Sequence, residues 1–299
     1  TMLTSFISGY AAERDRYPLA FAQNRLVQTY MEMGYDAKKR YGKDYEQYFL
    51  KALSVASKCR SENYPELDPN DWYFQEAAQN SGRIYAELGQ PERAREIFAS
   101  LLAREGTDAS RKAWAQREIA RTWAEEAKWR AGNGEFDVAL SIALTATTEF
   151  EKVLSVYNGK TVDRGHPAMD SLLDLGNMYR EIGRRMDDHD YDDIDEAHLA
   201  TVVSTYRTAV TAFERITDAD YGEYANKNHW AFYARYADCA DALLGMREWD
   251  LARGKLDLLL AIENLDSLFG AKRRLEALRD YAYTYRREAE LTDTWNDEL

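Results

Sequence analysis

Cysteine and proline are scarce in this chain, and long apolar runs are missing. Its two cysteines, Cys59 and Cys239, stand 180 positions apart without a Cys-x-x-Cys pair, so we expect neither a zinc site nor a disulfide framework. Both are expected to be buried, reduced thiols. Five prolines in 299 residues leave room for long helices. No stretch approaches the roughly 18 apolar residues of a membrane span, so no membrane insertion is expected.

Strand signals and basic charge are also low. Ala, Leu, Glu and Arg recur throughout, and apolar residues are spread among charges, which predicts an all-α protein. The formal charge of −13 argues against nucleic-acid binding, because phosphate neutralisation needs a basic surface. The opening residues lack the basic start of a signal peptide, which favours a cytoplasmic protein. The Thr ahead of Met2 leaves open that the chain is a segment of a larger protein.

One short pattern, Tyr-x-Glu-apolar-Gly, occurs three times, at residues 30–34, 85–89 and 179–183. After the second copy comes Pro91, which suits the first position of a helix, and Gly89 suits the left-handed residue that closes one. The pattern therefore predicts a helix end, a tight turn and a new helix. We expect turn glycines at 34, 89, 134 and 183, with intervals of 55, 45 and 49 residues.

Apolar residues at helical spacing predict a series of helix pairs. The predicted pairs are 18–34 with 45–59, 72–88 with 91–104, 114–131 with 136–156, 168–183 with 197–216, and 224–244 with 249–262. A last helix over 268–291 follows them.

The clearest pair carries Gly82, Tyr85, Gly89, Ala94 and Phe98, and with these residues it resembles the tetratricopeptide repeat. In that family, small residues let the paired helices approach and aromatic residues fill the space between hairpins. The resemblance implies an all-α, right-handed α-solenoid of about five antiparallel hairpins. It also implies a single domain over residues 1–299, with 268–291 as a capping helix.

First helices line the concave groove of tetratricopeptide proteins, so the resemblance implies a protein or peptide partner bound there. The positions that it assigns to partner binding are Asn24, Gln28, Gln79, Arg83, Lys128, Asn177 and Asp241. The family's carboxylate clamp is not matched, because Leu173 stands where its Lys belongs and Asp238 where an Asn belongs. The partner's identity and the oligomeric state stay open.

Motifs for catalysis or cofactor binding are missing. The four histidines show no ligand spacing, and no phosphate loop, nucleophile elbow or dinucleotide motif occurs, so we expect a non-catalytic scaffold without cofactors. The acidic insertion 187–196 spaces Asp188, Asp190 and Asp192 like the start of a calcium loop, yet lacks its central Gly and closing Glu. A solvated loop is the first interpretation, while a loose divalent site or a basic partner stays open.

Two other classes of function compete with the scaffold. One is an enzyme or ligand-binding domain with a pocket between hairpins, which converging carboxylates or histidines would favour. The other is an assembly subunit, in which the tyrosine-rich helix 268–291 packs on another chain instead of acting as a cap.

Overall fold

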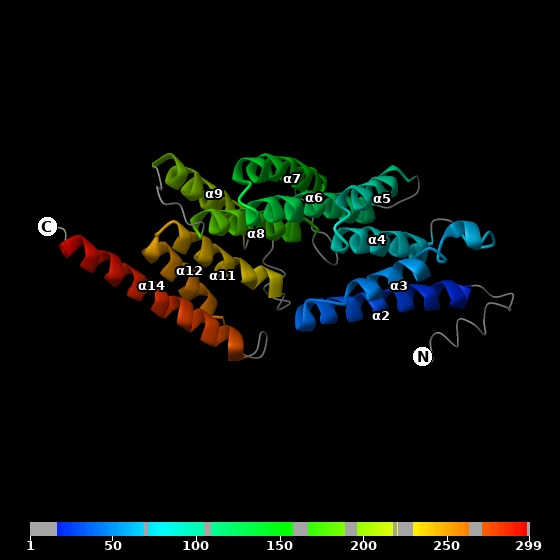
Figure 1. Ribbon diagram of the computed structural model, residues 1–299, viewed down its shortest axis with the longest axis horizontal. Coiled ribbons are helices and arrows are strands. Elements are labelled where there is room, and N and C mark those ends of the chain that lie inside the picture. Colours follow the sequence, from blue (N-terminus) through cyan, green and yellow to red (C-terminus); the bar gives the residue numbers. More distant parts are fainter. Residues whose placement is uncertain are drawn as a thin grey trace. The chain divides into compact units, whose positions relative to one another are not determined.

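The computed structural model describes residues 17–68, 71–104, 109–157, 167–188, 196–217, 220, 230–262 and 271–297. Within these ranges every regular element is a helix (Figure 1). They are α2 (Tyr17–Tyr41), α3 (Glu46–Ala56), a short 3₁₀ turn (Ser61–Asn63), α4 (Trp72–Glu87), α5 (Pro91–Ala103), α6 (Ala109–Gly132), α7 (Phe136–Tyr157), α8 (Pro167–Asp187), α9 (Glu196–Glu214), α11 (Trp230–Gly245), α12 (Trp249–Leu260) and α14 (Ala271–Asp297).

The chain divides into two compact units, Thr1–Thr122 and Trp123–Leu299, and the division falls inside α6. In unit 1, α2 packs on α3 and α4 packs on α5, and α4 also contacts both helices of the first hairpin. Ala115 on α6 joins a cluster with Ala94, Phe98 and Leu101 of α5. Each hairpin of unit 1 therefore buries its apolar face against the next element along the chain.

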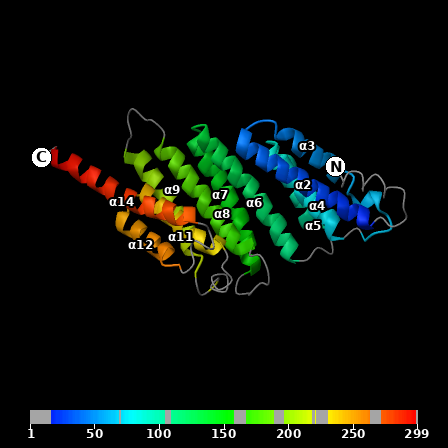
Figure 2. The same cartoon turned by 90° about the horizontal axis from the view of Figure 1, so that it is seen from below.

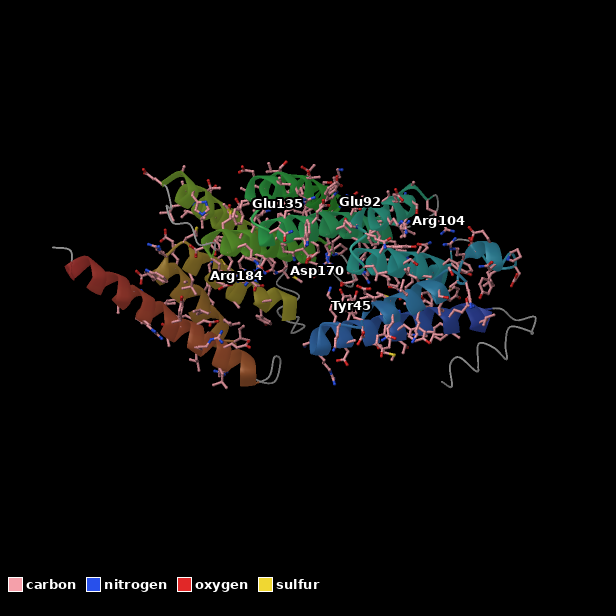
Figure 3. All side chains as sticks on the ribbon, viewed as in Figure 1. Tyr45, Glu92, Arg104, Glu135, Asp170 and Arg184 are labelled. Carbon is pink, nitrogen blue, oxygen red and sulfur yellow. The ribbon has the colours of Figure 1, made fainter. Side chains whose placement is uncertain are left out.

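Unit 2 repeats this sequential packing. α7 packs on α8, α8 on α9, α11 on α8, α9 and α12, and α12 on α14. Figure 2 shows α7, α8 and α9 side by side, and Figure 3 shows side chains filling the space between neighbouring helices. Ala277 of α14 is buried with Leu256 and Leu259 of α12, so α14 covers the last hairpin as the capping helix was expected to do.

The predicted all-α fold is confirmed. In the part of the chain that the structure describes, ten helices precede α14, and four pairs of them pack as hairpins, α2 with α3, α4 with α5, α8 with α9 and α11 with α12. The bounds of α4, α5, α7, α9 and α12 lie within two residues of those expected from the apolar spacing, while α2 and α8 run past their expected ends. Both cysteines are buried free thiols, and burial raises the pKa of Cys59 to about 12. The right-handed course and the single domain stay predictions.

The prediction of a turn is wrong at two of the four glycines, Gly34 and Gly183. α2 continues past Gly34 to Tyr41, and α8 continues past Gly183 to Asp187. A Cβ placed on Gly34 would lie 2.6 Å from Phe49 Cε1, and one placed on Gly183 would lie 3.1 Å from the Tyr206 ring. These glycines therefore serve close approach to an aromatic side chain of a packed helix.

Gly82 and Gly176 mark the same kind of contact. A Cβ on Gly82 would lie 2.6 Å from Phe98 Cζ, and one on Gly176 would lie 2.4 Å from Phe213 Cε1. Both phenylalanine side chains are buried. The close approach of α4 and α5 expected at Gly82 therefore meets the Phe98 ring, and Gly34 with Phe49 is its counterpart in the first hairpin.

Three hairpin turns in the described residues contain a glycine in the left-handed region. Gly42, Gly89 and Gly134 have positive φ angles and lie 47 and 45 residues apart, so the repeat is longer than the usual tetratricopeptide period. After Gly89, the Gln90 N–H donates to Tyr85 O at 2.9 Å, and after Gly134 the Glu135 N–H donates to Arg130 O at 3.0 Å. This is the Schellman arrangement, in which a left-handed residue ends the helix.

Candidate partner-binding groove

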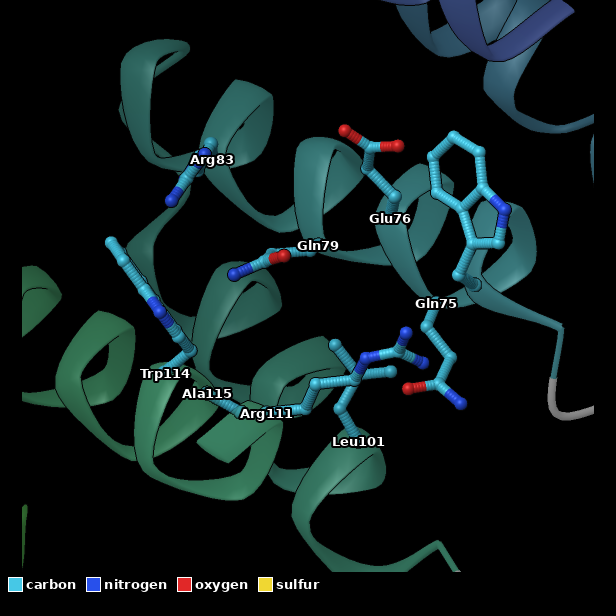
Figure 4. A pocket seen from close by; sticks show the side chains of 9 residues that line it. Gln75, Glu76, Gln79, Arg83, Leu101, Arg111, Trp114 and Ala115 are labelled. Atoms are coloured by element: carbon cyan, nitrogen blue, oxygen red, sulfur yellow. The ribbon is translucent and has the colours of Figure 1, made fainter. Parts of the chain in front are cut away.

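A pocket of about 350 Å³ opens in unit 1 between α4, the end of α5 and the start of α6. From α4 it takes Trp72, Glu76, Gln79 and Arg83, which follow one another at helical spacing on one face of that helix. The full lining is Trp72, Gln75, Glu76, Gln79, Arg83, Leu101, Arg111, Trp114 and Ala115 (Figure 4). We call this pocket the unit 1 groove. Two predicted site residues, Gln79 and Arg83, line it.

The carboxylate of Glu76 is held by two amides from α2. Asn24 Nδ2 donates to one Glu76 oxygen, and Gln28 Nε2 donates to the other at 2.6 Å. Arg25 in turn donates to Gln28 Oε1 at 2.9 Å. Asn24 and Gln28, both predicted site residues, therefore orient a side chain of the groove wall and are not part of its lining.

Arg83 forms a nearly buried ion pair with Glu118 of α6. Its Nη2 and Nε donate to Glu118 Oε1 at 2.6 and 3.1 Å, and Glu118 is only 4% exposed. Burial would raise the pKa of Glu118, but the charges of Arg83 and Arg121 outweigh burial and lower that pKa below its usual value. Glu118 is therefore ionised at neutral pH and ties α6 to α4.

Three hydrogen-bonding groups at the groove are left without a partner. Within the described ranges, the Gln79 amide forms no side-chain hydrogen bond, and the indole N–H groups of Trp72 and Trp114 donate to no residue. Gln79 extends toward Trp114 in Figure 4. The Arg83 guanidinium lies 5.8 Å from the Trp114 ring centroid, and that of Arg117 lies 5.0 Å from it, which holds the indole in place.

The expected alignment of the first hairpin is shifted by seven residues. A match of Gly34 to the turn residue Gly89 aligns Asn24 with Gln79 and Gln28 with Arg83. In the structure, however, Gly34 packs on Phe49 as Gly82 packs on Phe98. By that contact, the counterpart of Arg83 is Tyr35. Burial first and the Glu87 charge second raise the pKa of Tyr35 to about 12, so its hydroxyl stays protonated.

The three predicted site residues of unit 2 each have different contacts. Lys128 Nζ pairs with Glu125 at 2.6 Å, and Asp241 accepts from Arg180 Nη1 at 2.6 Å. Asn177 is half-buried, and its Oδ1 has no partner among the described residues. Asp241 lines a pocket of about 510 Å³ together with Arg184, Tyr206, Arg247 and others. Among the described residues, no hydrogen bond, ion pair or pocket joins two of these three side chains.

Sequence reasoning missed Trp72, Trp114 and Arg111. Trp72 precedes Gln79 by seven residues, so helical spacing alone places both on the face of α4 that carries Arg83. The signal was therefore present for Trp72. For Trp114 and Arg111 it was not, because their approach to α4 depends on how α6 packs against the α4 and α5 hairpin.

The acidic insertion lies mostly outside the described residues. Asp190 and Asp192 lie outside the described residues. Asp188 forms an ion pair with Arg184, with 2.9 Å between Asp188 Oδ2 and Arg184 Nη1. Among the described side chains, no group of three His, Cys, Asp or Glu residues has the arrangement to hold a metal ion. None of the described helices combines the length and apolarity needed to cross a membrane.

Comparison with known proteins gives only distant structural likeness. No protein-family model matches the chain, and no curated protein matches it. Among solved structures, the chain is similar to a crystal structure assigned as a kinesin light chain of Podosopora anserina with nearly identical tetratricopeptide-like repeats, at 14% identity and a TM-score of 0.40. A single-substitution variant of that protein is similar at 14% identity and a TM-score of 0.41. Each match covers 80% of this chain and 95% of the other chain.

Proposed function

We propose that this protein is a non-catalytic interaction module and that its unit 1 groove binds an extended segment of a partner protein. The observation that carries the proposal is the set of unpaired groups around the groove, the amide of Gln79 and the indole N–H groups of Trp72 and Trp114. A side-chain amide pairs with a peptide N–H and C=O at once, while indole N–H groups donate to peptide carbonyls. The two indole rings would cover the apolar side chains of the segment.

The groove's ionisable groups favour binding over catalysis. Its carboxylate, Glu76, already accepts hydrogen bonds from Asn24 and Gln28, and Arg83 is engaged with Glu118. Groups held in such pairs stabilise the wall of a pocket. A general base, by contrast, needs an accessible lone pair facing the substrate.

A peptide selection tests this function. The full chain is panned against a phage-displayed library of random 12-residue peptides, and selected peptides are titrated by fluorescence polarisation. We expect Trp114→Ala to raise the dissociation constant of a selected peptide about tenfold or more, as an aromatic anchor does. Gln79→Ala is expected to raise it roughly threefold to tenfold, the effect of one lost hydrogen bond pair.

Trp129→Ala is the matched control. Trp129 is 60% exposed on the α6 segment of unit 2, outside the groove, with Arg130 over its ring. Its replacement should leave the affinity of the peptide unchanged. Circular dichroism and thermal unfolding check that all three variants fold. Selection of no peptide, or of peptides insensitive to both groove variants, would contradict the proposed function.

A further inference from the structure

Helix α14 has two apolar faces, and the structure uses one of them. Ala277, Tyr281 and Thr284 follow each other at helical spacing and face α12, where Ala277 and Thr284 are buried. Arg253 of α12 donates to Glu288 at 2.7 Å on the same side of the helix. This face accounts for the packing of α14 within its own unit.

The second face is an exposed stripe that lies next to the first face on the surface of the helix. It consists of Leu275, Leu278, Ala282, Tyr285 and Ala289, which are spaced by three, four, three and four residues. Leu275 is 65% exposed, Leu278 47% and Tyr285 52%, and both alanines are exposed. Alternating steps of three and four residues form the seam of two-helix coiled coils. We call this set the α14 stripe.

The ring of Tyr285 is already held for contact. The Arg253 guanidinium lies 4.5 Å from its centroid, and the Tyr281 ring centroid lies 5.7 Å away. Fixing the ring before association lowers the conformational entropy lost on binding. The stripe thus presents a pre-positioned aromatic side chain beside small residues.

From Leu278 to Ala289, large and small residues alternate, so this part of the stripe is complementary to itself when reversed. If two copies of α14 run antiparallel, Leu278 of each can lie on Ala289 of the other, and Tyr285 can lie on Ala282. Leu278 and Tyr285 then each face an alanine, as close packing of two helices requires. A parallel pair in register would set Tyr285 on Tyr285 and Ala282 on Ala282, which leaves voids.

The charge sequence of the helix favours the same direction. Residues 271–281 contain four basic and two acidic residues, and residues 283–293 contain two basic and three acidic residues. An antiparallel pair places the net positive segment of each copy along the net negative segment of the other, and a parallel pair would place like segments together. Such complementarity selects orientation and partner.

We propose that the α14 stripe is a homodimer interface, in which a second copy of this chain packs its own α14 antiparallel. The symmetric pairing is an isologous contact with closed two-fold symmetry. The contact from Leu278 to Ala289 spans about 16 Å of helix. An interface of this length belongs to the small end of specific complexes, so the dissociation constant is on the order of micromolar.

Sedimentation velocity of the full 299-residue chain tests the dimer, with loading from about 1 to about 500 µM. We expect the sedimentation coefficient to rise with concentration as a monomer and dimer exchange. Leu278→Asp should raise the dimer dissociation constant about tenfold or more, because it buries an unpaired charge in the seam. Leu258→Asp makes the same change at a leucine of α12 that is 50% exposed and outside the stripe, and should leave the constant unchanged.

Cysteine cross-linking tests the direction and register. The native Cys59 and Cys239 are buried, so an oxidant such as copper phenanthroline reports on introduced thiols. In the proposed register, Leu278→Cys alone and Ala289→Cys alone place their thiols about 16 Å from their own copies, too far for a disulfide. A mixture of the two variants should cross-link, because position 278 of one copy then faces position 289 of the other.

Several results would overturn the dimer. These are a monomer at every concentration, equal effects of Leu278→Asp and Leu258→Asp, and cross-linking of Leu278→Cys with itself, which indicates a parallel pair. Circular dichroism verifies that each variant keeps its helix content. The peptide-binding assay of the unit 1 groove uses variants at residues outside α14, so a negative result for one proposal does not contradict the other.

Discussion

At the scale of single residues, the pair formed by Arg83 and Glu118 shows how a groove residue can serve the fold. Glu118 is nearly buried, and Arg83 and Arg121 supply the charges that keep it ionised. Replacing Arg83 by alanine would leave this carboxylate short of a partner and would lower stability as well as binding. Gln79 and Trp114 are therefore the better probes of the groove.

The same pair predicts a pH-dependent stability. The folded-state pKa of Glu118 lies below its unfolded value, so its carboxylate stabilises the fold above the unfolded pKa of about 4.3 and loses this effect as pH falls through the folded pKa. We expect Glu118→Gln to lower the free energy of unfolding by about 2 kcal/mol at pH 7. Urea denaturation of wild type and variant should show this difference shrinking at acid pH.

Glu125→Gln is the control for that experiment. Glu125 is also on α6 and pairs with Lys128, but its side chain is 62% exposed, so its removal should change stability little at any pH. A difference between wild type and Glu118→Gln that stays constant from pH 7 to strongly acid pH would contradict the assignment of an ionised, buried Glu118.

At the scale of elements, the turn between α11 and α12 has a residue other than glycine in the left-handed region. Between α11 and α12 the left-handed residue is Arg247, with φ of 61°, and the following Glu248 N–H donates to Leu243 O at 2.9 Å. The hydrogen bonding equals that at Gly89 and Gly134. Only the residue type differs, and a side chain in the left-handed region costs roughly 1 kcal/mol or more.

We therefore expect Arg247→Gly to stabilise the protein by up to about 1 kcal/mol, since the relief of backbone strain exceeds the added entropy of the unfolded chain. Gly89→Ala, the opposite change at an equivalent turn, should destabilise it by about 1 kcal/mol. Thermal and urea unfolding measure both. Equal effects of the two substitutions would show that the turn geometry does not control stability here.

At the scale of the whole molecule, sequential packing of hairpins implies that a destabilising substitution lowers stability only near its own hairpin. In repeat proteins, stability is a sum of terms from each repeat and its neighbours, so distant repeats respond little. Gly82 provides a test, because a Cβ there would lie 2.6 Å from Phe98 Cζ and the buried ring has no room to move.

Gly82→Ala should destabilise the second hairpin by about 2 kcal/mol. Hydrogen exchange read by mass spectrometry is expected to speed up in α4 and α5, while α11 and α12 exchange as in the wild type. Gly254→Ala is the control, because a Cβ at this helical glycine meets no atom within 4 Å and should cause no loss. Uniform acceleration along the chain would indicate one cooperative unit instead.

The sequence by itself determined the helices and their pairing. Apolar spacing and the scarcity of proline are local properties, so the bounds of α4, α5 and α7 could be read almost to the residue. The repeat pattern predicted a close approach of helices at Gly82, and the structure makes the Phe98 ring its contact. The resemblance assigned Gln79 and Arg83 to partner binding, and both line one pocket because they share one face of α4. Their role in binding stays a prediction.

Only the tertiary structure decided the rest. A glycine near a helix end suits both a turn and a close approach, and it is Phe49 and Tyr206, on packed helices, that make Gly34 and Gly183 contact positions. The same ambiguity shifted Asn24 and Gln28 out of register with Gln79 and Arg83. Trp114 enters the groove through the packing of α6, since contacts between helices depend on relative placement that spacing within one helix does not encode.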